Sequence, residues 1–226
     1  PPRSTLFPYT TLFRSMRYNA ISPDGTQIAF VYQGDIFVVP VAGGTARQLT
    51  TAASYESRPV WSNDGKTLAF VTDRNGGFDI YTVPAAGGRL NRVTYHSTGE
   101  TPLAFSADDK MIYFAASIQD PASSILFPTS WMTELYQIPV NGGRPEQVAA
   151  TPVCSMSLNQ DGRSFLYENR TGSENAWRKH HVSSVARDIW FYDAKANLHK
   201  QLTQNVGEDR NPIFVGNDEM IFLSER

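Results

Sequence analysis

Short runs of β-branched and aromatic residues recur along the chain, and each follows a turn of the Ser-Pro-Asp-Gly type. The copies of this block start at Ser22, Ser62, Ser106, Asn159 and Val215, and the last is one residue shorter. In such a turn Pro presets φ, Asp bonds to nearby backbone and Gly accepts a positive φ. The flanking apolar runs are typical of strands. Each copy therefore predicts two antiparallel strands joined by a tight turn.

A second block follows the first in four of the repeats. It opens on an acidic residue before an apolar pair, at Asp35, Asp79, Glu134 and Asp188. A glycine pair then supplies another hairpin turn. This pair is Gly43-Gly44, Gly87-Gly88 and Gly142-Gly143 in the first three repeats, with Ala196-Asn197 in the fourth. Each full repeat is therefore predicted to form four short antiparallel strands.

Four strands at a period of about 40 to 55 residues are the signature of a β-propeller blade. We predict an all-β propeller fragment of WD40-like type, with four blades and part of a fifth. Their approximate ranges are 16–51, 52–96, 97–151, 152–204 and the partial 205–226. Closed rings of such repeats usually have about six or seven blades, so we expect an open arc with missing blades and exposed strand edges.

Two long insertions interrupt the repeats, at about 117–133 and 169–186. Both fall at the second hairpin of a blade, whereas the Asp-Gly and Gly-Gly turns are the first and third hairpins. The insertions should therefore share one face of the propeller on neighbouring blades, opposite to the face that carries the Asp-Gly turns. Long loops on a rigid scaffold are a common place for binding.

The first fifteen residues do not share this pattern. Read back through codons, Pro1 to Ser15 resembles a translated short-read sequencing adapter. We therefore expect 1–15 to be a non-native, disordered segment that plays no part in the fold. Met16 is not necessarily the native start, and Arg226 falls in mid-repeat, so we expect blades to be missing and a signal peptide could have been lost with the native N-terminus.

Composition narrows the function classes. The chain is 41% hydrophobic and 19% charged with a net charge of −2, which gives no global basic excess for nucleic acid. No apolar run reaches the roughly 20 residues of a membrane helix. The single cysteine, Cys154, excludes an internal disulfide and a multi-cysteine zinc site, and we expect a buried thiol there.

No catalytic residue, metal site or cofactor is predicted. The serines at 22, 62 and 106 occupy one repeat position, which indicates turn chemistry, and no G-x-S-x-G nucleophile turn occurs. The acidic residues recur in the same way, so we expect them to be structural. The large aromatic residues of the strands are predicted to pack between blades. They are Phe30, Phe37, Phe70, Tyr81, Phe114, Tyr136, Tyr167 and Trp190, with Trp61 and Phe214 at a further shared position.

The second insertion holds the most reactive set of side chains, namely Trp177, Arg178, Lys179, His180 and His181. Adjacent histidines in an extended segment point apart, which disfavours a metal pair. Two interpretations stay open. The basic side chains could bind a peptide or its carboxylate, or the loop could be structural and pack Trp177 against the next blade.

The recurring blocks resemble the PD40 repeat of TolB-type propellers, over residues 16–226. The insertions are similar to those of the N-terminal propeller of bacterial tricorn-protease homologues, serine peptidases of the S41 class. The matching stretches are Ile118-Gln119-Asp120-Pro121, Leu126-Phe127-Pro128-Thr129, Trp177 to His181 and Arg187 to Trp190.

This resemblance implies a non-catalytic propeller that gates or guides peptide substrates, with PDZ and catalytic domains as its partners. It also implies an exported, periplasmic or secreted bacterial parent. The alternatives are a TolB-like protein-interaction propeller without enzymatic activity, and the propeller of a prolyl-oligopeptidase-type peptidase. The part of the gene beyond the codon for Arg226 would distinguish these three parents.

Overall fold

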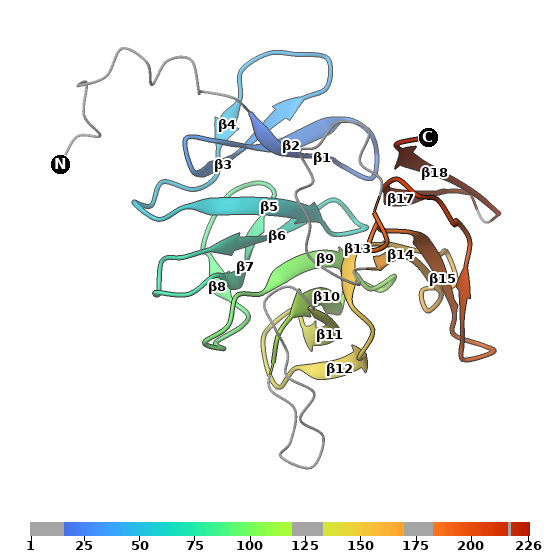
Figure 1. Ribbon diagram of the computed structural model, residues 1–226. Helices are drawn as coiled ribbons and strands as arrows, with labels where there is room; N and C mark the ends of the chain where they lie inside the picture. Colours follow the sequence, from blue (N-terminus) through green and yellow to red (C-terminus); the bar gives the residue numbers. More distant parts are fainter. Residues whose placement is uncertain (1–15, 119–132, 170–182, 217) are drawn as a thin grey trace.

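The computed structural model describes residues 16–118, 133–169, 183–216 and 218–226, and the described part contains strands and no helix. Figure 1 shows sheets that radiate from a common centre. The segment 1–15, most of both insertions, and Trp177 to His181 lie outside the described residues. The expectations for these segments stay predictions.

Four sheets have four antiparallel strands each, and a fifth has two. The first sheet comprises β1 (Arg17–Ile21), β2 (Gln27–Tyr32), β3 (Asp35–Pro40) and β4 (Arg47–Gln48). The second comprises β5 (Glu56–Trp61), β6 (Thr67–Thr72), β7 (Asp79–Pro84) and β8 (Asn91–Arg92). The third comprises β9 (Thr101–Phe105), β10 (Met111–Ala116), β11 (Glu134–Pro139) and β12 (Glu146–Ala149). The fourth comprises β13 (Val153–Leu158), β14 (Phe165–Asn169), β15 (Ile189–Asp193) and β16 (Leu198–Gln201), and the fifth β17 (Asp209–Val215) and β18 (Glu219–Ser224).

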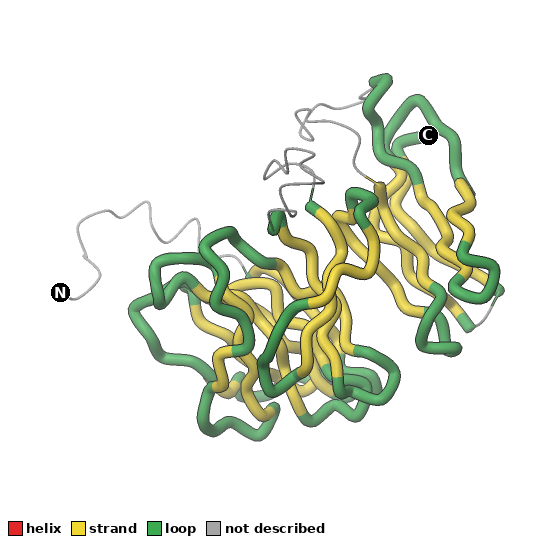
Figure 2. Tube along the Cα trace, turned by 90° about the horizontal axis from the view of Figure 1, so that it is seen from below, coloured by secondary structure: helices red, strands yellow, loops and turns green. Residues whose placement is uncertain are grey.

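The first strand of each sheet packs against the first strand of the next, in the order β1, β5, β9, β13 and β17. These strands surround the centre in Figure 1, and the later strands of each sheet lie further out. Figure 2 shows the same arc from the side. The predicted fold class is confirmed: the chain forms an open arc of propeller blades.

The Asp-Gly turns form as the residue types require. In the second blade Ser62 Oγ donates to Asp64 Oδ1 at 2.7 Å and accepts the Thr67 amide at 2.9 Å. Gly65 has φ +69° there, a conformation that side chains disfavour. The serines at 22 and 106 make the same pair of bonds. The predicted structural role of these serines is confirmed.

The acidic residues at the start of β3, β7 and β11, and just before β15, are also structural. Each accepts a hydrogen bond from a fourth-strand side chain: Asp35 from Gln48, Asp79 from Arg92, Glu134 from Gln147, and Asp188 from Gln201. These bonds connect the third strand to the short fourth strand, which makes few backbone bonds of its own. The repeat therefore uses its acids to hold the outer edge of each blade.

The hydrophobic core lies between neighbouring blades. One cluster joins Ile36 of the first blade to Leu68 and Phe70 of the second, and another joins Ile80 of the second to Phe114 of the third. Trp61 is buried, and its Nε1 donates to the Ala20 carbonyl across the first seam at 2.9 Å. The prediction that the aromatic residues pack between blades is confirmed for Phe70, Phe114 and Tyr167, which are almost fully buried; Phe37, Trp190 and Phe214 are half-buried.

Cys154 departs from expectation, because its thiol, which is in no disulfide, is only half-buried. It lies on β13, an innermost strand, and all the residues of that strand after Val153 are likewise partly exposed. The local sequence around Cys154 is apolar and small, but it does not show that its strand borders the centre of the arc.

Candidate functional site

The predicted peptide-binding residues Trp177, Arg178, Lys179, His180 and His181 lie outside the described residues, so that prediction stands untested. The described flanks of both insertions do lie between the second and third strands of their blades, as the repeat predicted. The starts of the first strands lie at the same end, because the Glu56 amide bonds to the Gly34 carbonyl in the β2–β3 turn. This end of the arc is therefore called the insertion face.

A pocket of about 570 Å³ opens on the insertion face, within the roughly 300–1,000 Å³ range of ligand sites. The first strands contribute Tyr18, Arg58 and Thr101, and the connections between strands contribute Tyr55, Phe78 and Glu100. Ser117 and Thr133, which flank the first insertion, also line it. We call this cavity the channel-mouth pocket.

β-Bulges interrupt the inner strands β1 and β5 where they line this pocket. The register of β1 and of β5 shifts near Tyr18 and Arg58, and both residues have φ near +50° (+52° and +53°). Asn211 has the same backbone conformation at the equivalent place in β17. The Arg58 guanidinium lies over the Tyr18 ring at 5.6 Å in a cation–π contact. Bulges commonly re-aim side chains next to functional sites.

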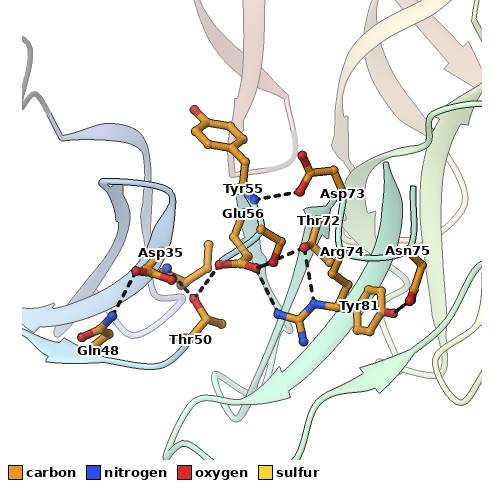
Figure 3. A network of polar contacts seen from close by, with 12 residues as sticks. Asp35, Gln48, Thr50, Tyr55, Glu56, Thr72, Asp73, Arg74, Asn75 and Tyr81 are labelled. Atoms are coloured by element: carbon orange, nitrogen blue, oxygen red, sulfur yellow. Dashed lines mark hydrogen bonds and ion pairs between the residues drawn. The ribbon is translucent and has the colours of Figure 1, made fainter. Parts of the chain in front are cut away.

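A buried acid lies at the start of β5, at the seam between the first two blades (Figure 3). Glu56 Oε2 accepts from Thr50 Oγ1 at 3.1 Å, and Glu56 Oε1 accepts from Ser54, Thr72 and Arg74 at 2.6, 3.1 and 3.0 Å. Both oxygens of this carboxylate are therefore paired, as a buried charge requires.

The next seam carries an acid at the same position, Glu100, with a different environment. Glu100 Oε2 accepts from Thr94 Oγ1 at 3.1 Å, as in the Glu56 site, but Glu100 Oε1 has no hydrogen-bond partner among the described residues. Glu100 is only 2% exposed, the lowest fraction among the residues that line the channel-mouth pocket.

Burial raises the pKa of Glu100 to about 8, and the negative charge of Asp79 acts in the same direction. The Thr94 hydrogen bond and the positive charge of Arg92 oppose the shift without cancelling it. Removal from water disfavours the charged form of a carboxyl group. The side chain is therefore mostly protonated at pH 7, and its buried Oε1 has no partner among the described residues.

The third and fourth seams differ from the first two in the residues that occupy or pair with the position of this acid. At the third seam the threonine and the acid are both replaced, by Ala149 and Val153, so no buried charge arises. At the fourth seam Asp209 takes the position of the acid, and its Oδ2 lies 3.3 Å from Arg226 Nη2 while its Oδ1 has no partner among the described residues. Beside it, Arg187 bonds to Glu168 and Glu208, at 2.5 Å in each case. Glu100, with one oxygen unpaired, is therefore less well satisfied than Glu56, Glu168 or Glu208.

The described residues contain no group of three or more His, Cys, Asp or Glu side chains that could hold a metal ion. Within the same ranges no helix is long and apolar enough to cross a membrane. The described insertion face offers a pocket with hydroxyl groups, aromatic rings, one guanidinium and one buried acid. Such a lining is suited to binding a polar ligand.

The radial four-stranded sheets and their central pocket define a β-propeller domain. The family described as "Tricorn protease N-terminal beta propeller domain" matches residues 14–226, and the chain belongs to this family. No protein among the curated sequences matches the chain.

Solved structures share the fold. The tricorn protease is 19% identical with a TM-score of 0.70, over 92% of this chain and 20% of that one. A TolB-like protein from Agrobacterium tumefaciens is 22% identical with a TM-score of 0.62, over 82% and 64% of the two chains. TolB from Acinetobacter baumannii is 17% identical with a TM-score of 0.62, over 87% and 46%. The chain thus spans less than two thirds of each of these structures, and at such identities the likeness shows the fold alone.

Sequence reasoning missed the channel-mouth pocket. A signal was nevertheless present, because a Thr and a Glu recur six residues apart, as Thr50 and Glu56 and again as Thr94 and Glu100. The repeated pair predicts two alike seams. The difference between them depends on residues 16 to 18 positions further along the chain, which only the fold brings to the acid.

Proposed function

We propose that this propeller is the non-catalytic, substrate-guiding domain of a tricorn-like serine peptidase of the S41 class. It binds peptides at the channel-mouth pocket and passes them toward a catalytic core carried on another part of the parent protein. The parent is a hydrolase exported to a bacterial periplasm.

The match to the tricorn N-terminal propeller family over residues 14–226 carries this proposal. The position of the pocket supports it, because Ser117 and Thr133 place the pocket beside the first insertion. Long loops around a rigid scaffold are suited to selecting ligands. The repeat serines act in turns, in agreement with a domain that has no nucleophile of its own.

The first test is to sequence the gene beyond the codon for Arg226. Two or three further blades and then a PDZ domain and an S41 core would support the proposal. In the full-length protein, Thr101→Trp should obstruct the channel-mouth pocket and lower kcat/KM for long peptides more than for dipeptide substrates. Asn91→Trp, an exposed position outside this pocket, is the matched control and should leave both unchanged. Equal losses for long and short substrates would refute a guiding role.

A TolB-like interaction propeller is the second candidate, favoured by the fold shared with TolB structures. In that case the gene would close the ring and encode no catalytic core. Peptidase activity would then be absent from the purified full-length protein, and Thr101→Trp would instead weaken the capture of a protein partner.

A further inference from the structure

The two buried glutamates occupy equivalent positions in consecutive blades. The Glu56 amide bonds to the Gly34 carbonyl and the Glu100 amide to the Phe78 carbonyl, both at the second hairpin of the preceding sheet. In each case a threonine six residues earlier donates to Oε2 at 3.1 Å. The same threonine oxygen accepts a backbone amide, from Ile36 or from Ile80. The chain therefore offers two copies of one site.

At Glu56 the chain supplies a cation for the second carboxylate oxygen. Arg74 Nη2 lies 3.0 Å from Glu56 Oε1, and its guanidinium lies over the Tyr81 ring at 5.1 Å. Thr72 and Ser54 complete the set of donors around this oxygen (Figure 3). The charge of this buried carboxylate is thus neutralised by an arginine held on an aromatic face.

At Glu100 none of the residues equivalent to Thr72, Arg74 and Ser54 donates a hydrogen bond to the acid. The strand registers align Thr72 with Ala116 and Arg74 with Ile118, so an apolar residue replaces each donor. Thr98, which replaces Ser54, has its hydroxyl 2.9 Å from His96 Nδ1 instead. The result is a carboxyl oxygen without a partner among the described residues, in a side chain that is almost fully removed from solvent.

The channel-mouth pocket lies against this unpaired acid. It contains Tyr55 and Phe78, two exposed aromatic side chains that could stack on a guanidinium as Tyr81 does on Arg74. A planar guanidinium suits such a position better than an ammonium, because it is less strongly hydrated and stacks on rings. The volume of the pocket also exceeds what one side chain needs, which leaves room for the flanking peptide.

We propose that the channel-mouth pocket binds an arginine side chain of a peptide, with its guanidinium paired to Glu100 as Arg74 is paired to Glu56. This inference rests on the proposed function, namely that the domain binds peptides. When the arginine binds at neutral pH, Glu100 gives up its proton to solvent and becomes the carboxylate that the guanidinium requires. Arg58 is a second cation in the same pocket, and its repulsion disfavours additional positive charges on the ligand.

The test compares two blocked peptides that differ in one group. A fluorescein-labelled Gly-Gly-Arg-Gly-Gly peptide, amidated at its C-terminus, is titrated with the 226-residue chain at pH 8 and followed by fluorescence polarisation. The matched peptide carries citrulline, which has the shape of arginine without its charge. We expect the arginine peptide to bind about 10- to 100-fold more tightly, as for hydrogen bonds to charged groups.

Two variants locate the arginine. Glu100→Gln should abolish the preference for arginine over citrulline. Ile118→Arg should reproduce in the third blade the intramolecular guanidinium that Arg74 supplies in the second. It should thereby compete with the peptide arginine for Glu100 while the chain stays folded, as monitored by circular dichroism. Asn91→Gln is the matched control and should retain the preference.

Each outcome has one meaning. Equal binding of the two peptides, or an arginine preference that survives Glu100→Gln, would overturn this inference and leave peptide binding intact. If neither peptide nor a mixture of random pentapeptides binds, the proposed peptide-guiding function fails, and the inference fails with it.

Discussion

Replacing Glu100 by Gln should stabilise the protein at neutral pH, whereas the same change at Glu56 should destabilise it. The pKa of Glu100 is raised from 4.5 to about 8 by burial. The folded protein therefore holds this proton more tightly than the unfolded chain, so the free energy of unfolding falls as pH rises from about 4.5 to about 8. Glutamine has no proton to lose and avoids this penalty.

The magnitude is set by the size of the pKa shift. Each pKa unit corresponds to about 1.4 kcal/mol, so the penalty is roughly 3 kcal/mol at pH 7 and about 5 kcal/mol above pH 8. For a chain of this length, Glu100→Gln should raise Tm by about 6–12 °C at pH 7. Near pH 4.5 the two proteins should differ little, because Glu100 is then protonated in the folded state and about half protonated in the unfolded state, which leaves a penalty of only about 0.4 kcal/mol.

Glu56→Gln is the opposing control. Glu56 is fully buried, and both of its oxygens are paired, one of them with Arg74. Removing its charge leaves the guanidinium without its partner, at a cost of about 3–5 kcal/mol. Thermal unfolding between pH 4.5 and 8, monitored by circular dichroism, measures both variants. The reasoning is refuted if Glu100→Gln lowers Tm at pH 7, or if its effect does not grow with pH.

Further predictions concern the ligand and the seams. Affinity for the arginine peptide should rise about tenfold or more from pH 6 to pH 8 and be flat for Glu100→Gln. The other charged or titratable groups near Glu100 are Asp79, Arg92, His96, Arg58, Tyr18, Tyr55 and Tyr95, so a rise that persists in Glu100→Gln would assign the effect to them. Asp109→Gly introduces the glycine that the other full repeats carry at this turn, yet it should lower the free energy of unfolding by about 1 kcal/mol. The reason is that Asp109 accepts hydrogen bonds from the Asn63 and Asp64 amides across a seam. A urea midpoint at or above that of the unmodified chain would contradict this. Gly142→Ala should cost about 1–3 kcal/mol, since φ is +85° and its Cβ would meet the Val93 carbonyl at 3.3 Å. The control Gly43→Ala, with φ +87° and open space, should cost less in the same urea titration, and equal costs would show that the seam contact is unimportant.

Much of the fold could be predicted because its determinants are close in sequence. The Ser62 hydroxyl bonds within five residues of itself, and Gly65 supplies its own positive φ. Such turns form wherever the residue types recur, and their spacing fixes strand number and order. The position of the described flanks of the insertions, between the second and third strands, was predictable from the same alternation of hairpins. The half-buried state of Cys154 was not, because it depends on which strand borders the centre.

The candidate site depends on contacts that the repeat pattern does not contain. Thr94 and Glu100 repeat Thr50 and Glu56 so closely that the sequence predicts the same environment for both acids. The tertiary structure decides otherwise, because Ala116 and Ile118 stand where Thr72 and Arg74 reach the carboxylate.

The sequence by itself thus determined a run of four-stranded blades, their turns and their common face. Only the tertiary structure decided which buried acid is paired and which is not. The physical reason is that local backbone geometry is set within a few residues, whereas the charge state of a buried carboxyl depends on desolvation and on donors brought from other strands.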